Sequence, residues 1–167
     1  RHYRRQRQMC IRDRSIDMNT MKIIKKDFIN LGIAVDTPQG LIVPNIKSAN
    51  KMSIREISSE IARLADLSKS RKVKVDDLKG STFTISSLGS FGGKYFTPII
   101  NPPEVAILGI SKSYESVFMK DNKPVNITNL PISLSYDHRI INGVEGVKFT
   151  TRFCETLSDI NYFEESF

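Results

Sequence analysis

Two short stretches of this sequence contain side chains that can move a proton or hold a negative charge. The first, SYDHRIING, places His138 between Asp137 and Arg139 and ends with Asn142 before a glycine. Histidine ordinarily exchanges a proton near neutral pH, so it suits removal of a proton from a thiol or hydroxyl nucleophile. The second, TISSLGSFGG, carries Ser86 beside a glycine-rich loop, where a hydroxyl can donate to a developing oxyanion.

Each stretch also has a simpler interpretation. A lone histidine beside an aspartate and an arginine at a strand end is commonly a solvated or salt-bridged loop residue. Ser86 and Ser87 alternate faces on a predicted strand, and an inward serine often does no more than hydrogen-bond the backbone. Taken one at a time, the two stretches leave both alternatives open.

Other kinds of site fit the sequence poorly. The loop GSFGGK continues with Tyr95, where a phosphate-binding loop requires serine or threonine, and its spacing is wrong. Outside the first 14 residues there is one histidine and one cysteine, which cannot make a protein-only zinc site. We therefore expect no metal.

The net charge of +7 comes mainly from one end of the chain. Residues 1–14 contain six arginines and one aspartate, whereas the remaining 153 residues carry 19 basic and 17 acidic side chains. This distribution does not favour a nucleic-acid-binding surface. Residues 4–14 closely resemble a translated transposon adapter used in DNA library preparation, in which ATG-TGT-ATA-AGA-GAC reads Met-Cys-Ile-Arg-Asp. We predict that residues 1–14 are a non-native extension and that residues 15–167 are a partial domain; a genuine arginine-rich arm is the alternative.

The composition fits one globular domain with a substantial core, since 40% of its residues are hydrophobic and nine are phenylalanines. No apolar run approaches the roughly 18 residues needed to cross a membrane, so no membrane association is expected. Two cysteines do not form a disulfide framework, which makes a reducing compartment the default.

The elements that must position His138 and Ser86 are a mixed set of strands and helices. Apolar runs at 32–36 and 41–46 flank a Pro-Gly turn and predict a covered hairpin. Residues 53–70 predict a helix with a Ser53–Glu56 capping box, and residues 143–160 predict a second helix. Further strands are expected at 81–88, 104–111 and 130–137, with a hairpin that turns at residues 121–123. The order lacks a repeated βαβ unit, which favours an α/β or α+β sheet covered by helices.

Three longer motifs occur in order: GIAVDTPQGLIVPNIKSA, TFTISSLGSFGGKYFTPIINPPEVAILGIS and LSYDHRIING. Together they resemble the catalytic domain of the dihydrolipoamide acyltransferases, the core component of 2-oxo acid dehydrogenase complexes. The resemblance extends from about residue 30 to residue 159. ISSLG followed by GG and FTPIIN is most similar to the acetyl-transferring, pyruvate dehydrogenase branch.

The resemblance implies transfer of an acetyl group from S-acetyldihydrolipoyllysine to coenzyme A. His138 matches the base that deprotonates the coenzyme A thiol, and Ser86 matches the oxyanion donor. Asn142 stands where the family usually has aspartate, and we interpret it as a residue that orients the histidine loop. Asp137 and Arg139 are expected to brace that loop by ion pairing. A further set is expected along the substrate channel: Gly89, Phe91, Gly92 and Gly93.

The same resemblance implies a two-layer sandwich like that of chloramphenicol acetyltransferase, truncated at its N-terminus. It implies homotrimers with Ser86 and His138 supplied by neighbouring chains, assembled into a larger hollow core. The lipoyl group would be carried on a separate domain, and the decarboxylase and dihydrolipoamide dehydrogenase would be partners. A bacterial protein of this kind is expected in the cytoplasm, and a eukaryotic one in the mitochondrial matrix.

Three other functions remain as alternatives. The chain can belong to a succinyl or branched-chain branch of the family. It can be a free-standing acetyltransferase for a small hydroxylated molecule, although Asp137 stands where that relative has a second histidine. It can also be a non-catalytic core scaffold, which Asn142 prompts.

Overall fold

The structure is a computed structural model that describes residues 11–17, 19–89 and 91–164. The strands are β1 (Arg14–Asp17), β2 (Lys22–Lys25), β3 (Leu31–Ile33), β4 (Val35–Thr37), β5 (Gly40–Ile42), β6 (Asn45–Ile46), β7 (Phe83–Ser87), β8 (Ala106–Ile110), β9 (Tyr114–Lys120), β10 (Lys123–Asn129) and β11 (Ile132–Tyr136). The helices are α2 (Ile54–Lys69), α3 (Gly143–Ser158) and α4 (Ile160–Glu164), with single 3-10 turns η1 (Ala49–Lys51) and η2 (Val75–Leu78).

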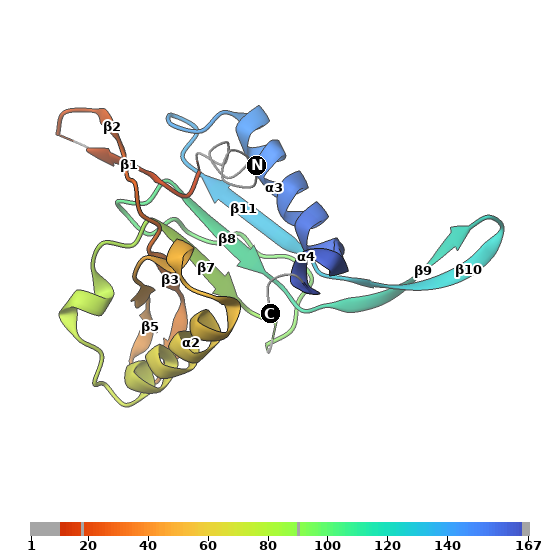
Figure 1. Ribbon diagram of the computed structural model, residues 1–167, viewed down its shortest axis with the longest axis horizontal. Helices are drawn as coiled ribbons and strands as arrows, with labels where there is room; N and C mark the ends of the chain where they lie inside the picture. The colour runs from red at the N-terminus through yellow and green to blue at the C-terminus, as the bar shows by residue number, and fades with distance from the viewer. Residues whose placement is uncertain (1–10, 18, 90, 165–167) are drawn as a thin grey trace.

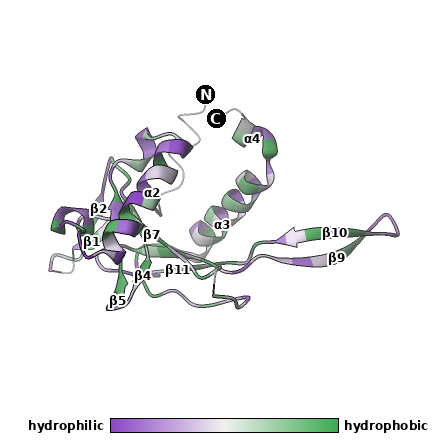
Figure 2. Cartoon of the chain, turned by 90° about the horizontal axis from the view of Figure 1, so that it is seen from below, coloured by the Kyte–Doolittle hydropathy of each residue, from purple (hydrophilic) through white to green (hydrophobic). Residues whose placement is uncertain are grey.

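The main sheet has the strand order β11-β8-β7-β3-β6. Its three central strands, β8, β7 and β3, run parallel, and the two edge strands are antiparallel to their neighbours. Helices α2 and α3 both cover one face of this sheet (Figure 1), and the view from below shows them together above it (Figure 2). The predicted mixed sheet covered by helices is confirmed.

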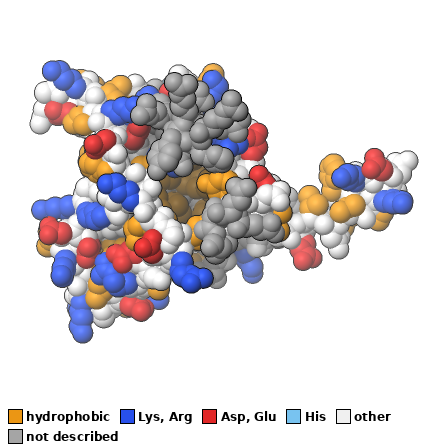
Figure 3. Space-filling model, in the orientation of Figure 1, with side chains coloured by type: hydrophobic (Ala, Val, Ile, Leu, Met, Phe, Trp, Pro, Cys, Tyr) orange, Lys and Arg blue, Asp and Glu red, His pale blue; other side chains and the backbone are white. Residues whose placement is uncertain are grey.

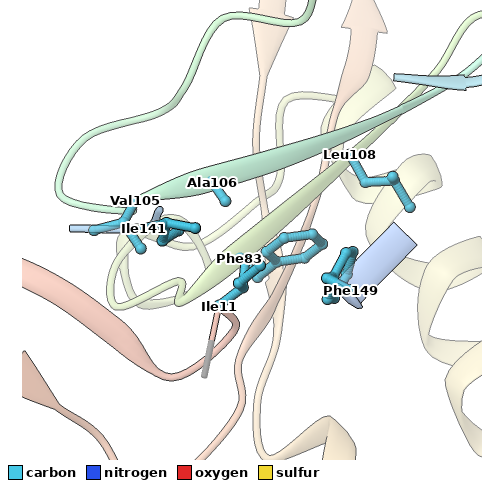
Figure 4. Close-up of a cluster of buried hydrophobic side chains, with 7 residues drawn as sticks. All are labelled: Ile11, Phe83, Val105, Ala106, Leu108, Ile141 and Phe149. Carbon is cyan, nitrogen blue, oxygen red and sulfur yellow. The ribbon is translucent and has the colours of Figure 1, made fainter. Parts of the chain in front are cut away.

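The hydrophobic core lies between this sheet and its two helices. Phe149 of α3 packs on Phe83 of β7 with ring centroids 5.6 Å apart, and Leu108 and Ile141 belong to the same buried cluster (Figure 4). A second cluster lies under α2, which begins at the predicted Ser53–Glu56 capping box: Ile46, Ala49 and Leu64. Because Leu31 of β3 packs against both clusters, the two helices rest on one continuous apolar surface.

The predicted hairpin at 32–46 is present but differs in two respects. Each predicted run is split, so that β3 and β6 pair within the main sheet while β4 and β5 form a separate ribbon. The prediction of a fully covered pair is wrong for the ribbon, because Leu41 is 65% exposed. Asp36 and Leu41 are paired residues on the ribbon's open face, whereas Val35 lies on the buried face.

Strands β9 and β10 form an arm that projects from the body (Figures 1 and 3). The predicted turn is confirmed, since Asp121 and Asn122 both have positive φ angles, as a two-residue hairpin turn requires. The arm exposes an unusual set of apolar side chains: Val117, Phe118, Met119, Val125 and Ile127. Within the described residues no other strand pairs with either strand of the arm.

Helix α3 has two apolar stripes, but only one of them packs inward. Phe149 and Phe153 contact the core, whereas Val144, Val147 and Leu157 are exposed. In the described part of the chain no helix is both long and apolar enough to cross a membrane.

The predicted non-native extension lies mostly outside the described residues. Of its last residues, Ile11 is buried in the main core and Arg14 begins β1, which pairs with β2 in a hairpin that the sequence did not predict. Arg14 Nη1 lies 3.6 Å from Glu145 Oε1. The origin of residues 1–14 stays a prediction, because packing does not reveal whether a residue is native.

Candidate functional site

His138 lies on a turn that is anchored at both ends. At its start, the Asp137 amide donates to Val105 O at 2.8 Å, which continues the β11–β8 ladder by one bond. The Asp137 carbonyl then accepts from the amides of Ile140 (3.0 Å) and Ile141 (2.9 Å). Ile141 is fully buried in the main core, so the turn is fixed to the sheet by its backbone and to the core by a side chain.

The carboxylate of Asp137 and the guanidinium of Arg139 form a bidentate ion pair across the turn. Arg139 Nε donates to Oδ1 at 2.9 Å and Nη2 donates to Oδ2 at 2.6 Å, while the Arg139 amide also donates to Oδ1. The hydrogen bonds from Arg139 lower the pKa of Asp137 below its ordinary value. The expected bracing of the histidine loop by these two residues is present in the geometry.

The His138 side chain is exposed between these anchors. Its ring packs against the Tyr136 ring, with centroids 5.8 Å apart and planes inclined by 36°. Tyr136 itself packs against the core and against Gly146 of α3. The imidazole therefore contacts Tyr136 on one side and is otherwise exposed, which leaves its nitrogens accessible to a bound reactant.

Asn142 is the N-cap of α3. Its Oδ1 accepts from the Glu145 amide at 2.9 Å, and Glu145 Oε2 accepts from the Asn142 amide at 3.2 Å, which together form a capping box. The sequence contained this signal, because the NGVE run has the same spacing as the Ser53–Glu56 box, but it was not recognised there. Asn142 thus holds the point where the His138 turn enters the helix.

Replacement of Asn142 by alanine is expected to lower the free energy of unfolding by about 1 kcal/mol, because it removes an N-cap acceptor. Asn142→Asp should keep the cap, since a carboxylate also accepts from the Glu145 amide. Chemical denaturation of the three proteins measures the difference. Equal stability of the alanine variant and the wild type would contradict the capping role.

Ser86 lies on β7, on the face of the sheet that α2 and α3 do not cover. Phe83 and Ile85 of the same strand pack into the helix-side core, so the alternation of a strand sends Ser86 to the opposite face. There it is paired with Gly109 of β8, over which Phe96 and Pro98 pack. The Ser86 side chain is half-buried there.

One chain does not bring Ser86 and His138 together. Ser86, Gly109 and Ser133 lie in one row across three strands, and His138 comes after the far end of β11. At about 3.3 Å per residue and 4.8 Å per strand, Tyr136 is already roughly 14 Å from Ser86. The two candidate catalytic side chains are therefore beyond hydrogen-bond reach within a single chain.

The described residues of the glycine-rich segment after β7 have no regular secondary structure, as predicted. Gly92 and Gly93 have φ angles of 96° and 82°, which explains glycine there, and a Cβ at either would meet no atom within 4 Å. Gly89 lies against the Ser111 carbonyl, and Phe91 is 73% exposed. The open surface at Phe91, Gly92 and Gly93 is compatible with a substrate channel, which stays a prediction for all four residues.

No group of three or more histidine, cysteine or acidic side chains that could hold a metal ion is present among the described residues. The site consists of an accessible imidazole on a braced turn and a serine hydroxyl under a glycine-rich segment. These groups suit proton transfer and oxyanion stabilisation.

Comparison with known proteins places these features in a family. Residues 7–163 match the family model described as 2-oxoacid dehydrogenases acyltransferase (catalytic domain). The chain belongs to this acyltransferase family. Among curated family members, the dihydrolipoyllysine-residue acetyltransferase of the pyruvate dehydrogenase complex from Buchnera aphidicola subsp. Acyrthosiphon pisum is 45% identical over 148 residues, 89% of this chain and 37% of the relative. The Cupriavidus necator protein of the same name is 48% identical over 137 residues, 82% of this chain and 25% of the relative.

Solved structures of the acyltransferase family share the fold. The Azotobacter vinelandii dihydrolipoamide acetyltransferase, whose catalytic mechanism was investigated at a serine, a histidine and an asparagine, matches with a TM-score of 0.86 and 42% identity, over 92% of this chain and 63% of that one. The cubic core of a pyruvate dehydrogenase multienzyme complex matches with a TM-score of 0.85 and 43% identity, over 91% and 63%. A chloramphenicol acetyltransferase matches with a TM-score of 0.52 at 13% identity, which shows the fold alone, over 84% and 66%.

The chain spans less than two fifths of the length of these two curated acyltransferases and about two thirds of the solved chains. The predicted family and its sandwich fold are confirmed.

Proposed function

We propose that this protein transfers an acetyl group from S-acetyldihydrolipoyllysine to coenzyme A, as part of a pyruvate dehydrogenase-type complex. One observation carries the proposal. The intervals from Ser86 to His138 and from His138 to Asn142 are identical to those between the serine, histidine and asparagine investigated in the A. vinelandii enzyme. The geometry supports it, because His138 is an accessible base and Asn142 fixes its turn.

The chemistry follows from the side chains present. His138 accepts the proton of the coenzyme A thiol, a group whose ordinary pKa of about 8.5 leaves it mostly protonated near pH 7. The thiolate sulfur attacks the thioester carbon, and the Ser86 hydroxyl donates to the oxygen that becomes negative. When the tetrahedral intermediate collapses, the dihydrolipoyl sulfur leaves and takes the proton from the His138 imidazolium. No acyl-enzyme is formed.

This mechanism requires two chains, because Ser86 and His138 lie at opposite ends of one sheet and near opposite faces. The β9–β10 arm supports a chain-to-chain contact. An isolated two-stranded hairpin is at best marginally stable in water, and exposed apolar side chains such as Phe118, 58% exposed, mark interaction surfaces. In the proposed homotrimer, each site combines Ser86 of one subunit with His138 of the next.

The wider assembly follows from the same proposal. Trimers build a larger core, to which separate domains deliver lipoyl groups that the decarboxylase component acetylates and dihydrolipoamide dehydrogenase reoxidises. The compartment is the bacterial cytoplasm, or the mitochondrial matrix if the source is eukaryotic. Coenzyme A and the acylated lipoyl group are substrates, and the proposed chemistry uses no metal.

Ser86 and its neighbour offer a matched pair of variants that test the oxyanion role. Ser86→Ala is expected to lower kcat by about 10²–10³-fold, the usual effect of losing one oxyanion donor. Ser87→Ala should stay within about threefold of the wild type, because the exposed Ser87 points away from the Ser86 face. The measurement is acetyl transfer from acetyldihydrolipoamide to coenzyme A by the full-length protein. Equal effects of the two changes would contradict the assignment.

The same assay separates the alternatives. Succinyl and branched-chain thioesters test the other acyl branches, and a hydroxylated acceptor in place of coenzyme A tests a free-standing acetyltransferase. A scaffold without activity would show no turnover with any of these substrates, and its Asn142→Asp variant would acquire turnover.

A further inference from the structure

A buried carboxyl group that the proposed chemistry does not use lies next to the His138 turn. Glu104 precedes β8 and is only 4% exposed. Its Oε1 accepts from the Thr84 hydroxyl of β7 at 2.8 Å and from the Asn101 side-chain amide at 3.3 Å. A carboxyl group is costly to bury, so its presence there calls for a specific role.

The strand ladders show what this carboxyl group holds in place. The pairing of β7 with β8 begins at Thr84 and Ile107, so Glu104 and Val105 extend beyond it. The Glu104–Thr84 hydrogen bond is the side-chain contact that ties this extension back to β7. Val105 O, in turn, accepts from the Asp137 amide that starts the His138 turn. One side chain therefore connects the strand of Ser86 to the anchor of His138.

We infer that Glu104 is a positioning residue for the catalytic histidine: its carboxyl group, bonded to Thr84 of β7, fixes Val105 and through it the His138 turn. This inference rests on the proposed function, but its structural part can be tested without it.

The surroundings of the carboxyl group favour the neutral form. Glu104 Oε2 and Ser81 Oγ are both buried, and neither makes a hydrogen bond of ordinary geometry within the described residues, although the Ser81 hydroxyl lies close enough to oppose the rise in the pKa of Glu104. Burial raises the pKa of Glu104, and the opposing effects of the nearby polar groups and of Lys26, the charged side chain that faces it, do not cancel that rise. A protonated Oε2 can donate to Ser81 Oγ, which would satisfy both atoms.

The hydroxyl groups of Thr84 and Ser81 are tightly packed against β3. A Cβ at Gly32 of β3 would collide with both Thr84 Oγ1 and Ser81 Oγ. The two hydroxyls are thus confined between β3 and the carboxyl group. Because the Thr84 hydroxyl is held in place, its hydrogen bond to Glu104 restrains the residue that precedes Val105.

The test compares Glu104→Gln and Glu104→Ala in the full-length protein. Glutamine has the shape of the neutral acid and is expected to keep kcat within about twofold. Alanine is expected to lower kcat by about 10–100-fold with little change in the KM for coenzyme A, because a small misplacement of a catalytic group is sufficient for such a loss. Should the alanine variant fail to fold, Thr84→Val removes the same hydrogen bond and should lower kcat in the same direction.

The matched control is Asn45→Ala. Asn45 is 1% exposed and its side-chain amide donates to two backbone carbonyls, but it lies on β6 at the sheet edge opposite β11. Its loss should lower stability without changing kcat per folded molecule. If Asn45→Ala lost as much kcat as Glu104→Ala, the positioning role would be overturned. A folded Glu104→Ala protein with the kcat of the wild type would overturn it as well.

Two readouts do not depend on acetyl transfer. Hydrogen exchange at the Asp137 amide should accelerate at least tenfold in Glu104→Ala and remain unchanged in Asn45→Ala. A raised acid pKa in the folded state means that stability from Glu104 is greatest at low pH and is lost as pH rises above the ordinary glutamate value. The melting temperature of the wild type should therefore fall relative to Glu104→Gln as pH rises. Unchanged exchange at Asp137 would overturn the inference even if the wild type proved inactive.

Discussion

Replacement of His138 by alanine is expected to lower kcat for acetyl transfer to coenzyme A by about 10²–10⁴-fold, the range that a positioned general base contributes. The coenzyme A thiol is mostly protonated near neutral pH, and without the imidazole it has no acceptor for its proton. The KM for coenzyme A should change little, because His138 acts on the reacting sulfur and is one contact among many. Steady-state kinetics of the full-length protein measure both parameters.

Folding should not be responsible for this loss. The His138 side chain is exposed, and surface substitutions usually change the free energy of unfolding by no more than about 0.5 kcal/mol. Lys148→Ala is a suitable control, since Lys148 is an exposed residue of the neighbouring helix and should leave both stability and kcat unchanged. Normal turnover by a folded His138→Ala protein would exclude His138 as the base.

Mixing two inactive variants is expected to restore activity. In a cyclic trimer whose sites combine Ser86 of one subunit with His138 of the next, a mixed trimer of Ser86→Ala and His138→Ala chains has one intact site in three. Equal random mixing makes three quarters of the trimers mixed, so recovery should reach about one quarter of wild-type activity. Co-expression of the two chains in equal amounts, followed by purification through an affinity tag that both carry, gives the sample to assay.

The control replaces one partner with a chain that carries both substitutions. His138→Ala mixed with the double variant contains no histidine base in any subunit and should stay inactive. If mixed assemblies of the two single variants were as inactive as each variant alone, Ser86 and His138 would have to act within one chain. That result would contradict the roughly 14 Å separation that the sheet register imposes between Ser86 and Tyr136.

Local patterns predicted most of the fold because they depend on near neighbours. The Ser53–Glu56 box and its apolar stripe gave α2, and the Asp121–Asn122 turn gave the β9–β10 hairpin. The split of residues 32–46 into two strand pairs was not predictable, because it depends on β7 pairing with β3 and not with β4. Strand partners distant in sequence leave no periodic signal.

The candidate site likewise has some features that the sequence predicts and others that it does not. His138 and its ion-paired flanks were visible in one short stretch, whereas the anchors of the turn were not. Val105 contributes only a backbone carbonyl, which no side-chain pattern reveals, and Ile141 is one apolar residue among many. Glu104 was also missed, because its significance comes from burial against Thr84 and not from its own identity.

The choice of an amide at the start of α3 affects how the enzyme responds to acid. Asn142 Oδ1 accepts the Glu145 amide without carrying a charge, so this cap cannot be lost by protonation. An aspartate in its place would gain a proton as the solution became acidic, and the helix start would then weaken together with the turn that it supports. With asparagine, acid can weaken the support of the turn at Asp137 and Glu145, whose carboxylates accept hydrogen bonds, but not at this acceptor.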